Sequence, residues 1–232
     1  MLVLVSFLMP RALLRRKKKI SMLTVSSIES VRPRSNARRI LFVEMSDYET
    51  LPQQVVRAMN LKIADTFSSI EEFKAKAEKH LYECAKERSL RIVSRKDCTL
   101  GEVGKKLSED CYDRATITAI RQFLIEYQLC DDAEYLRRFV SSKLQQGIPE
   151  RKIRQDLIKK HLEKDAIEEE LEKQMNQDTL DNQLNKAIKL IENISLEDKK
   201  SQDKAFRKLV SRGYTFDQAK KAIKYLQDRA TC

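Results

Sequence analysis

Apolar residues recur at helical spacing most regularly in the second half of the chain. A helix over residues 132–146 would carry four of them on one face, with Tyr135 and Phe139 on its flank: Ala133, Leu136, Val140 and Leu144. Asp131 or Asp132 is suited to cap its N-terminus, because a carboxylate accepts hydrogen bonds from the first backbone N–H groups. Gly147 can end the helix, since glycine adopts the left-handed conformation common at helix C-termini. The pattern predicts one amphipathic helix with a defined beginning and end.

Two shorter helices are predicted directly after it. Pro149 can open the first of them, because a proline in the first helical turn sacrifices no hydrogen bond. The second is expected from Asp165 to Met175. Their inward-facing positions, at helical spacing, are Ile153, Leu157, Ile167 and Leu171. Together the three helices make a compact three-helix module.

The residues of this module resemble those of the RecX family of regulatory proteins. The likeness rests on the turn Asp131-Asp132-x-x-Tyr135, the pair Phe139-Val140, Gly147 and the helix segment Ile153-Arg154-x-x-Leu157. It covers about residues 76–230 and is strongest at 129–171. The chain departs from the family pattern at Cys130, where a large aliphatic residue is usual, and at His161, where glycine is favoured. The resemblance implies tandem three-helix repeats and a protein that restrains the RecA recombinase filament.

The apolar pattern of the module recurs on both sides of it. A shift of fifty residues relates three positions of an earlier segment to Ile153, Leu157 and Leu162, namely Val103, Leu107 and Tyr112. A shift of 52 carries the pattern forward, to Leu209 and Tyr214. One corresponding turn would then contain Cys111, His161 and Gly213. Such internal similarity is typical of repeat architectures.

Three modules are therefore expected, near residues 76–130, 131–178 and 180–230. Each would expose an apolar face that its neighbour must cover, so the modules are expected to stack into an elongated, curved array. The predicted fold class is mostly α, with tandem three-helix repeats and a small strand-containing N-terminal segment.

That N-terminal segment is expected over residues 22–75. Two runs are of β type: residues 40–43, and a weaker one formed by Leu23, Val25 and Ile28. Longer members of the RecX family carry a similar strand-containing segment before the repeats. A helix is predicted from about Ile70, capped by Ser69.

Residues 1–21 combine an apolar stretch with the basic run Arg15 to Lys19. The apolar stretch is shorter than the ~20 residues that cross a bilayer, and a secretory signal would place the positive charge first. We expect a disordered extension or a start codon upstream of the true one at Met22; an organelle transit peptide is the alternative.

The net charge of +11 belongs mainly to this end of the chain. Residues 1–39 hold ten Lys/Arg and one acid, so the remainder carries only +2. That remainder has blocks of alternating sign: residues 137–162 hold eight Lys/Arg and two acids, 163–198 four and eleven, and 199–229 ten and three. Such blocks suit a nucleic acid or a partner with its own charge pattern, although solvated helix surface is the simpler interpretation.

The sequence offers little material for catalysis. It has two histidines, and it lacks a glycine-rich phosphate loop and a nucleophile elbow. The five cysteines form no C-x-x-C pair, and the Glu168-Glu169-Glu170 run is typical of a solvated helix face rather than a metal site. We expect no enzyme activity, no cofactor and no metal. Scattered thiols suggest a reducing compartment, and a cytoplasmic location is expected.

Binding chemistry is better represented. Cations on the outward faces of the predicted helices would line one side of the array, and arginine can form bidentate hydrogen bonds with carboxylates or phosphates. The candidate partner-binding residues are Arg137, Arg138, Lys143, Arg151, Lys152, Arg154, Lys159, Lys204, Arg207, Lys208 and Arg212. They indicate an acidic or polyanionic partner without choosing between the two.

Two functions follow as hypotheses. By resemblance to the RecX family, the chain would act as a monomer in the groove of a RecA-type filament. There it would inhibit ATPase activity and strand exchange in recombination, DNA repair and the SOS response. The alternative is a helical-repeat protein that binds single-stranded or double-stranded nucleic acid directly through its basic face. Neither hypothesis involves a membrane.

Overall fold

A small antiparallel sheet begins the part of the chain that the computed structural model describes, residues 22–33 and 35–230. Its strand order is β3-β2-β1-β4, with the strands β1 (Leu23–Ser30), β2 (Ala37–Phe42), β3 (Tyr48–Pro52) and β4 (Thr66–Phe67). A short helix, α1 (Gln53–Ala58), follows β3. The two predicted β-type runs are confirmed as β1 and β2, except that β2 ends at Phe42 and leaves Val43 outside the strand. The structure adds β3, α1 and β4 to them. The expectation for residues 1–21 lies outside the described residues.

The buried face of the sheet packs on the start of α2 (Ile70–Val93). Phe73 of α2 is fully buried, and its ring meets those of Phe42 and Phe67 edge to face, with both centroid distances at 5.2 Å. Aromatic pairs in this geometry contribute about 0.5–1.5 kcal/mol beyond their buried area. The three rings therefore fix the sheet onto α2.

The first three-helix module consists of α2, α3 (Leu100–Glu109) and α4 (Arg114–Glu126). The predicted cap of α2 is confirmed, since the side chain of Ser69 accepts the N–H of Glu72 at 3.3 Å. The helix runs without a break through residues 75 and 76, where the strand-containing segment and the first module are expected to divide. One hydrophobic cluster extends from Val25 in the sheet to Leu124 in α4. The sheet and the first module therefore share a core.

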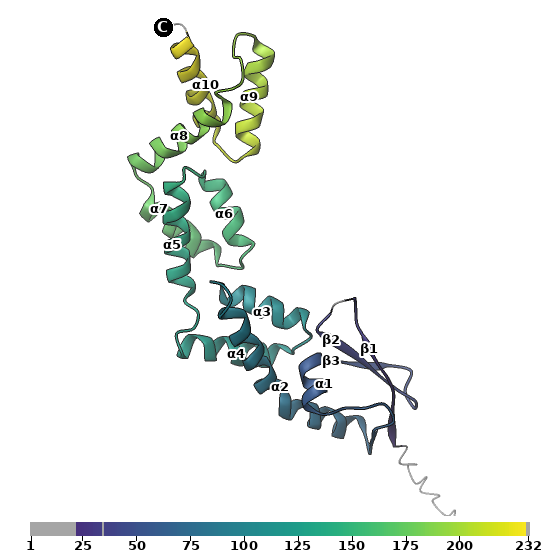
Figure 1. Ribbon diagram of the computed structural model, residues 1–232. Coiled ribbons are helices and arrows are strands. Elements are labelled where there is room, and N and C mark those ends of the chain that lie inside the picture. Colours follow the sequence, from purple (N-terminus) through teal and green to yellow (C-terminus); the bar gives the residue numbers. More distant parts are fainter. Residues whose placement is uncertain (1–21, 34, 231–232) are drawn as a thin grey trace, which may run out of the picture.

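Two further modules continue the chain. They consist of α5 (Asp132–Gln145), α6 (Glu150–Ile158) and α7 (Lys164–Gln174), then α8 (Gln177–Ile191), α9 (Lys199–Ser211) and α10 (Phe216–Ala230). Each has a hydrophobic cluster of its own, which includes the fully buried Leu157 in the second module and Leu209 in the third. Figure 1 shows an elongated, curved body with the sheet at one end and α10 at the other. The predicted fold class is confirmed.

The ends of α5 are those that the sequence predicts. The side chain of Asp131 accepts the N–H of Glu134 at 2.9 Å, and Gly147 follows the helix with a φ of +69°. Three of the four predicted inward positions are buried: Leu136, Val140 and Leu144. The prediction for Ala133 is wrong: this residue lines an open groove between the first two modules and is exposed.

The turn between the second and third helices has the same form in every module. Its central residues have positive φ, at +67° for Cys111, +61° for His161 and +99° for Gly213. In each turn the following N–H bonds to a carbonyl five residues earlier, in the pairs Tyr112–Leu107 (3.0 Å), Leu162–Leu157 (3.4 Å) and Tyr214–Leu209 (3.3 Å). This is the Schellman arrangement. The predicted correspondence of the three turns is confirmed.

The first junction between modules joins the start of α3 to the turn after α6. The hydroxyl of Thr99 donates to the carbonyl oxygen of Lys160 at 2.5 Å, and the first N–H of α3 donates to the carboxylate of Asp132 at 2.8 Å. Gly101 lies so close to the turn that a methyl group on its Cα would be 2.4 Å from the Cβ of His161. Only glycine permits this approach.

The second junction uses equivalent elements, the start of α6 and the turn after α9. The hydroxyl of Tyr214 donates to the carbonyl oxygen of Gly147 at 3.1 Å. Gln183 of α8, which is fully buried, donates to the carbonyl of Ile148 at 3.2 Å and accepts a bond from Gln218 at 2.6 Å. The modules are thus joined by directional hydrogen bonds, and these set how one module follows the next.

Candidate partner-binding surface

Helix α6, with the C-cap residue Lys159 that follows it, presents three cations to solvent. Arg151, Lys152 and Lys159 are exposed, whereas Ile153 and Leu157 are fully buried in the second module. The exposed and buried positions are those that the helical period predicts. The outward charges can therefore be changed without touching the core.

Arg154 lies at the edge of this face and is already engaged. Its Nε and Nη2 atoms donate to the two carboxylate oxygens of Glu168 in α7, at 2.5 and 2.7 Å. The hydrogen bonds lower the pKa of Glu168 from its ordinary value and raise the pKa of Arg154. The bidentate pair ties α6 to α7, so a partner would have to compete with Glu168 for this guanidinium.

The cations of α5 also have neighbours. Arg137 pairs with Glu134 at 2.6 Å, and Arg138 pairs with Asp97 at 3.1 Å. The ammonium of Lys143 lies 5.4 Å from the centre of the Phe139 ring. Arg137 also lines the groove between the first and second modules, away from α9. Exposed ion pairs of this kind contribute only about 0–1 kcal/mol, so a partner could replace them.

In the third module the predicted cations divide into two groups. Lys208 donates to the carbonyl of Leu190 near the C-terminus of α8 at 2.6 Å, where a cation is favoured by the helix dipole. Lys204, Arg207 and Arg212 are exposed. This second group is the one that faces solvent.

The second junction brings Arg151 next to the third module. A methyl group on Gly213 would lie 3.6 Å from the Cβ of Arg151, so the turn that carries Arg212 sits against the start of α6. A groove of about 290 Å³ runs along this contact, and we call it the junction groove. Its lining includes Glu150, Arg151, Arg154, Val210, Tyr214, Thr215, Phe216 and Gln218.

Phe216 is the residue of the junction groove that the sequence reasoning missed. Its side chain is 61% exposed, and its ring stacks on Phe206 with a centroid distance of 5.6 Å. It precedes the buried stripe of α10, which contains Ala219 and Ala222. The signal available in the sequence was an aromatic residue at the first position of a helix, shortly after the Gly213 turn. Arginine and aromatic residues in one groove have the composition of binding hot spots.

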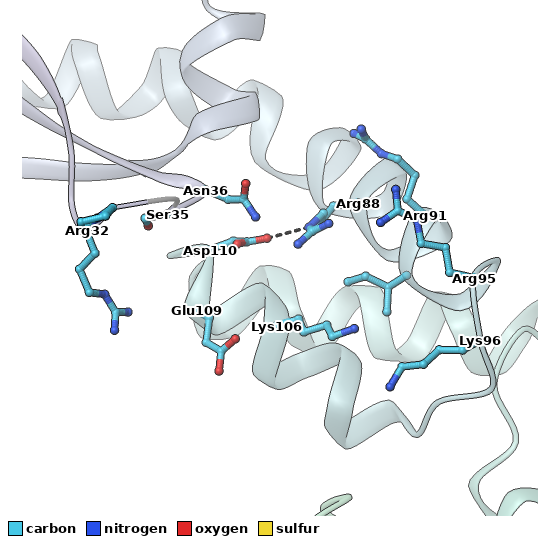
Figure 2. A pocket seen from close by; sticks show the side chains of 12 residues that line it. Arg32, Ser35, Asn36, Arg88, Arg91, Arg95, Lys96, Lys106, Glu109 and Asp110 are labelled. Carbon is cyan, nitrogen blue, oxygen red and sulfur yellow. Dashed lines mark hydrogen bonds and ion pairs between the residues drawn. The ribbon is translucent and has the colours of Figure 1, made fainter.

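A second concentration of positive charge lies at the other end of the molecule, between the sheet and the first module (Figure 2). This basic cleft has a volume of about 640 Å³ and is lined by Arg32, Pro33, Ser35, Asn36, Arg88, Arg91, Ile92, Arg95, Lys96, Lys106, Glu109 and Asp110. The sequence did not reveal it, because its lining residues are far apart along the chain, at 32–33 and 35–36, at 88–96 and at 106–110.

Other chemistry is limited in the part of the chain that the structure describes. Within it, no three His, Cys, Asp or Glu side chains are grouped to hold a metal ion, and no helix is long and apolar enough to cross a membrane. Of the acidic run, Glu169 pairs with Lys173 at 2.7 Å. Cys84, Cys98 and Cys130 are buried free thiols.

Comparison with known proteins gives consistent matches. The family model for the second three-helix domain of RecX matches residues 131–171. A regulatory protein RecX of Vibrio parahaemolyticus is 33% identical over 141 residues, which cover 61% of this chain and 90% of that protein. One of Clostridium botulinum is 30% identical over 115 residues, or 50% of this chain and 54% of that protein. The chain thus matches about half the length of the Clostridium relative.

Two solved structures share the fold. The crystal structure of RecX from Lactobacillus salivarius superposes with a TM-score of 0.54 at 21% identity, covering 64% of this chain and 98% of that one. A second crystal structure of a regulatory protein RecX has a TM-score of 0.54 at 20% identity and covers 89% of this chain and 99% of that one. The second match extends the shared fold over most of the chain.

Proposed function

Because the chain belongs to the RecX family of regulatory proteins, we propose that it binds a RecA-type recombinase filament in the cytoplasm and inhibits its ATPase and strand-exchange activities. Family membership supports a regulatory role without a catalytic centre. The activity and the partner are proposals, supported by the shape and the surface of the molecule.

The observation that carries the proposal is the position of the α6 cations beside the junction groove. Arg151 belongs to both, and the exposed ring of Phe216 lies in the same groove. A partner could therefore meet long-range charge and an aromatic anchor at one place. Charge accelerates encounter, whereas a desolvated aromatic or arginine contact slows dissociation.

The elongated array explains how such contact could inhibit. A filament repeats the same surface at regular intervals, and a body of stacked modules can touch more than one subunit at once. A regulator that binds one arrangement of neighbouring subunits more tightly shifts the filament toward it. Subunits held in this way would turn over ATP and exchange strands more slowly.

The test is a charge reversal on α6. Replacing Arg151, Lys152 and Lys159 with glutamate changes the local charge by six units and leaves Ile153 and Leu157 in place. Glutamate has a helix propensity close to that of lysine and arginine, so helical circular dichroism should be nearly unchanged. Some local cost is expected, because Lys152 pairs with Asp156 at 2.8 Å. Inhibition of recombinase ATPase and strand exchange should be lost.

A matched control carries the same change of charge elsewhere. Lys79→Glu, Lys164→Glu and Lys189→Glu lie on exposed positions of α2, α7 and α8 and should leave inhibition intact. Equal loss in both variants would show that total charge matters rather than the α6 face. Full inhibition by the α6 variant would mean that this face does not bind the filament.

Binding to bare single-stranded DNA separates the two functional hypotheses. If the α6 variant loses DNA binding in step with inhibition, and wild-type binding falls steeply with salt, direct nucleic-acid binding explains the activity. If inhibition is lost while DNA binding is unchanged, the filament protein is the partner.

A further inference from the structure

The basic cleft gathers cations from three elements onto one hollow. Arg32 comes from the turn between β1 and β2, Arg88, Arg91 and Arg95 from the C-terminal part of α2 and the residues just after it, and Lys106 from α3. Figure 2 shows Arg32 on one side of the hollow, and Arg91 and Arg95 on the other. Arg88 and Arg91 are three positions apart on α2 and therefore share one helix face, and Arg95 follows just after the helix, so all three line the same wall of the cleft.

The positive charge of the cleft is not balanced from within. Six Lys/Arg line it against two carboxylates, Glu109 and Asp110. Asp110 is buried and is already committed to Arg88, with Oδ2 at 2.7 Å from Nε. This ion pair holds Arg88 in place, and the carboxylate of Asp110 is then not available to balance the charge of the other cations.

Three of these cations have no ion pair with another described residue. They are Arg32, Arg95 and Lys106, whose side chains also form no hydrogen bond within residues 22–33 and 35–230. Like charges held close together repel one another, and a bound anion would relieve that repulsion. The cleft therefore offers unpaired positive charge to an anion.

The size and the lining of the cleft indicate the chemical class of that anion. A hollow of about 640 Å³ lies in the range of small-molecule sites. Planar guanidinium forks match phosphate oxygens. Pro33 and Ile92 are its apolar lining residues and no aromatic side chain is among them, so a nucleic-acid base would find no ring on which to stack.

We propose that the basic cleft binds the phosphate chain of a small oligophosphate, such as a nucleoside triphosphate or inorganic tripolyphosphate, without recognising a base. Adjacent phosphoryl groups would bridge Arg32 on the sheet side to Arg95 and Lys106 on the helix side. The ligand would thus link the turn between β1 and β2 to the first module. This site is separate from the α6 face and does not depend on the filament proposal.

The test is titration of the full chain with inorganic tripolyphosphate, followed by isothermal calorimetry at physiological salt. We expect one binding site, and a melting temperature that rises with ligand concentration because only the folded state binds. ATP should bind with similar affinity, and adenosine should not bind. Hydrogen exchange should slow in residues 88–96.

The variants separate the cleft from general charge. Replacing Arg32, Arg95 and Lys106 with glutamine should weaken tripolyphosphate binding at least tenfold and leave circular dichroism unchanged. The matched control neutralises three exposed lysines outside the cleft, with Lys79→Gln, Lys164→Gln and Lys189→Gln, and should bind as the wild type does. Equal weakening in both variants would overturn the proposal.

The absence of tripolyphosphate binding at millimolar concentration would also overturn it. If a single-stranded oligonucleotide then bound the wild type but not the cleft variant, the cleft would contact a nucleic-acid backbone instead. Recombinase inhibition is measured separately, and its loss or retention in the cleft variant does not bear on the calorimetry.

Discussion

The hydroxyl of Tyr214 donates a hydrogen bond to the carbonyl oxygen of Gly147 at 3.1 Å, between residues 67 positions apart in the sequence. Gly147 ends α5 in the second module, and Tyr214 follows the left-handed turn of the third. Tyr214 is only 3% exposed. The residue that ends one helix thus also supplies the acceptor that positions the next module.

Removing this hydroxyl should loosen the third module. In Tyr214→Phe the ring remains, but the buried carbonyl of Gly147 loses its partner, which costs about 1–3 kcal/mol. The free energy of opening of α8–α10, measured by native-state hydrogen exchange, should fall by that amount, with α2–α4 unchanged. Unchanged protection of α8–α10 would show that the bond does not hold the junction.

The hydrogen bond between Tyr214 and Gly147 also predicts that the stability of the protein depends on pH under alkaline conditions. Burial raises the pKa of Tyr214 to about 12 from its ordinary value of 10. A raised pKa means that folding favours the protonated phenol. Its contribution to the free energy of unfolding is therefore complete below pH 10 and is lost as pH rises toward 12. The stability difference between wild type and Tyr214→Phe should shrink over this window. Both proteins contain the other groups that titrate in this range, including Tyr112, whose pKa burial also raises. Their contributions therefore cancel in the stability difference.

Two glycines of α3 should respond oppositely to alanine. In Gly101→Ala the new methyl would lie 2.9 Å from the carbonyl oxygen of His161, which is backbone and cannot move alone, so about 1–3 kcal/mol should be lost. In Gly104→Ala it would meet the flexible end of Arg121, and the better helix propensity of alanine should gain up to about 1 kcal/mol. Urea unfolding measures both. Equal stability of the two variants would contradict the close approach at the first junction.

At the centres of the left-handed turns, glycine should be more stable than a residue with a side chain. His161 has a φ of +61°, a conformation that costs a side chain about 1–2 kcal/mol, so His161→Gly should be neutral or stabilise by up to about 1 kcal/mol. Gly213 has a φ of +99°, and Gly213→Ala should lose about 1–2 kcal/mol. Thermal unfolding of both variants tests the equivalence of the turns; destabilisation by His161→Gly would show that its side chain is needed at the junction.

Opposite faces of α6 provide the simplest test of the core. Leu157 is fully buried, and Leu157→Ala should cost about 2–5 kcal/mol. Gln155 is exposed on the same helix, and Gln155→Ala should stay within about 0.5 kcal/mol. Urea denaturation followed by circular dichroism distinguishes the two. Similar losses would mean that the helix is not packed on the second module as described.

Local features of this chain were open to prediction from sequence. The inward positions of α6 and α7, the cap at Asp131 and the corresponding turns at Cys111, His161 and Gly213 all depend on residues within one or two helical turns. Helical period, capping and left-handed turns act over that range, so the order of residues determines them directly.

Features that join distant segments were decided by the tertiary structure. Phe73 is an apolar position in a helix by sequence, but only packing places it between Phe42 and Phe67 and so merges the sheet with the first module. Likewise Arg32 and Lys106 line the same basic cleft because the fold places the turn between β1 and β2 across from α3. Such contacts depend on how complete elements cover one another's apolar faces, and this is a property of the packed chain that no local pattern contains.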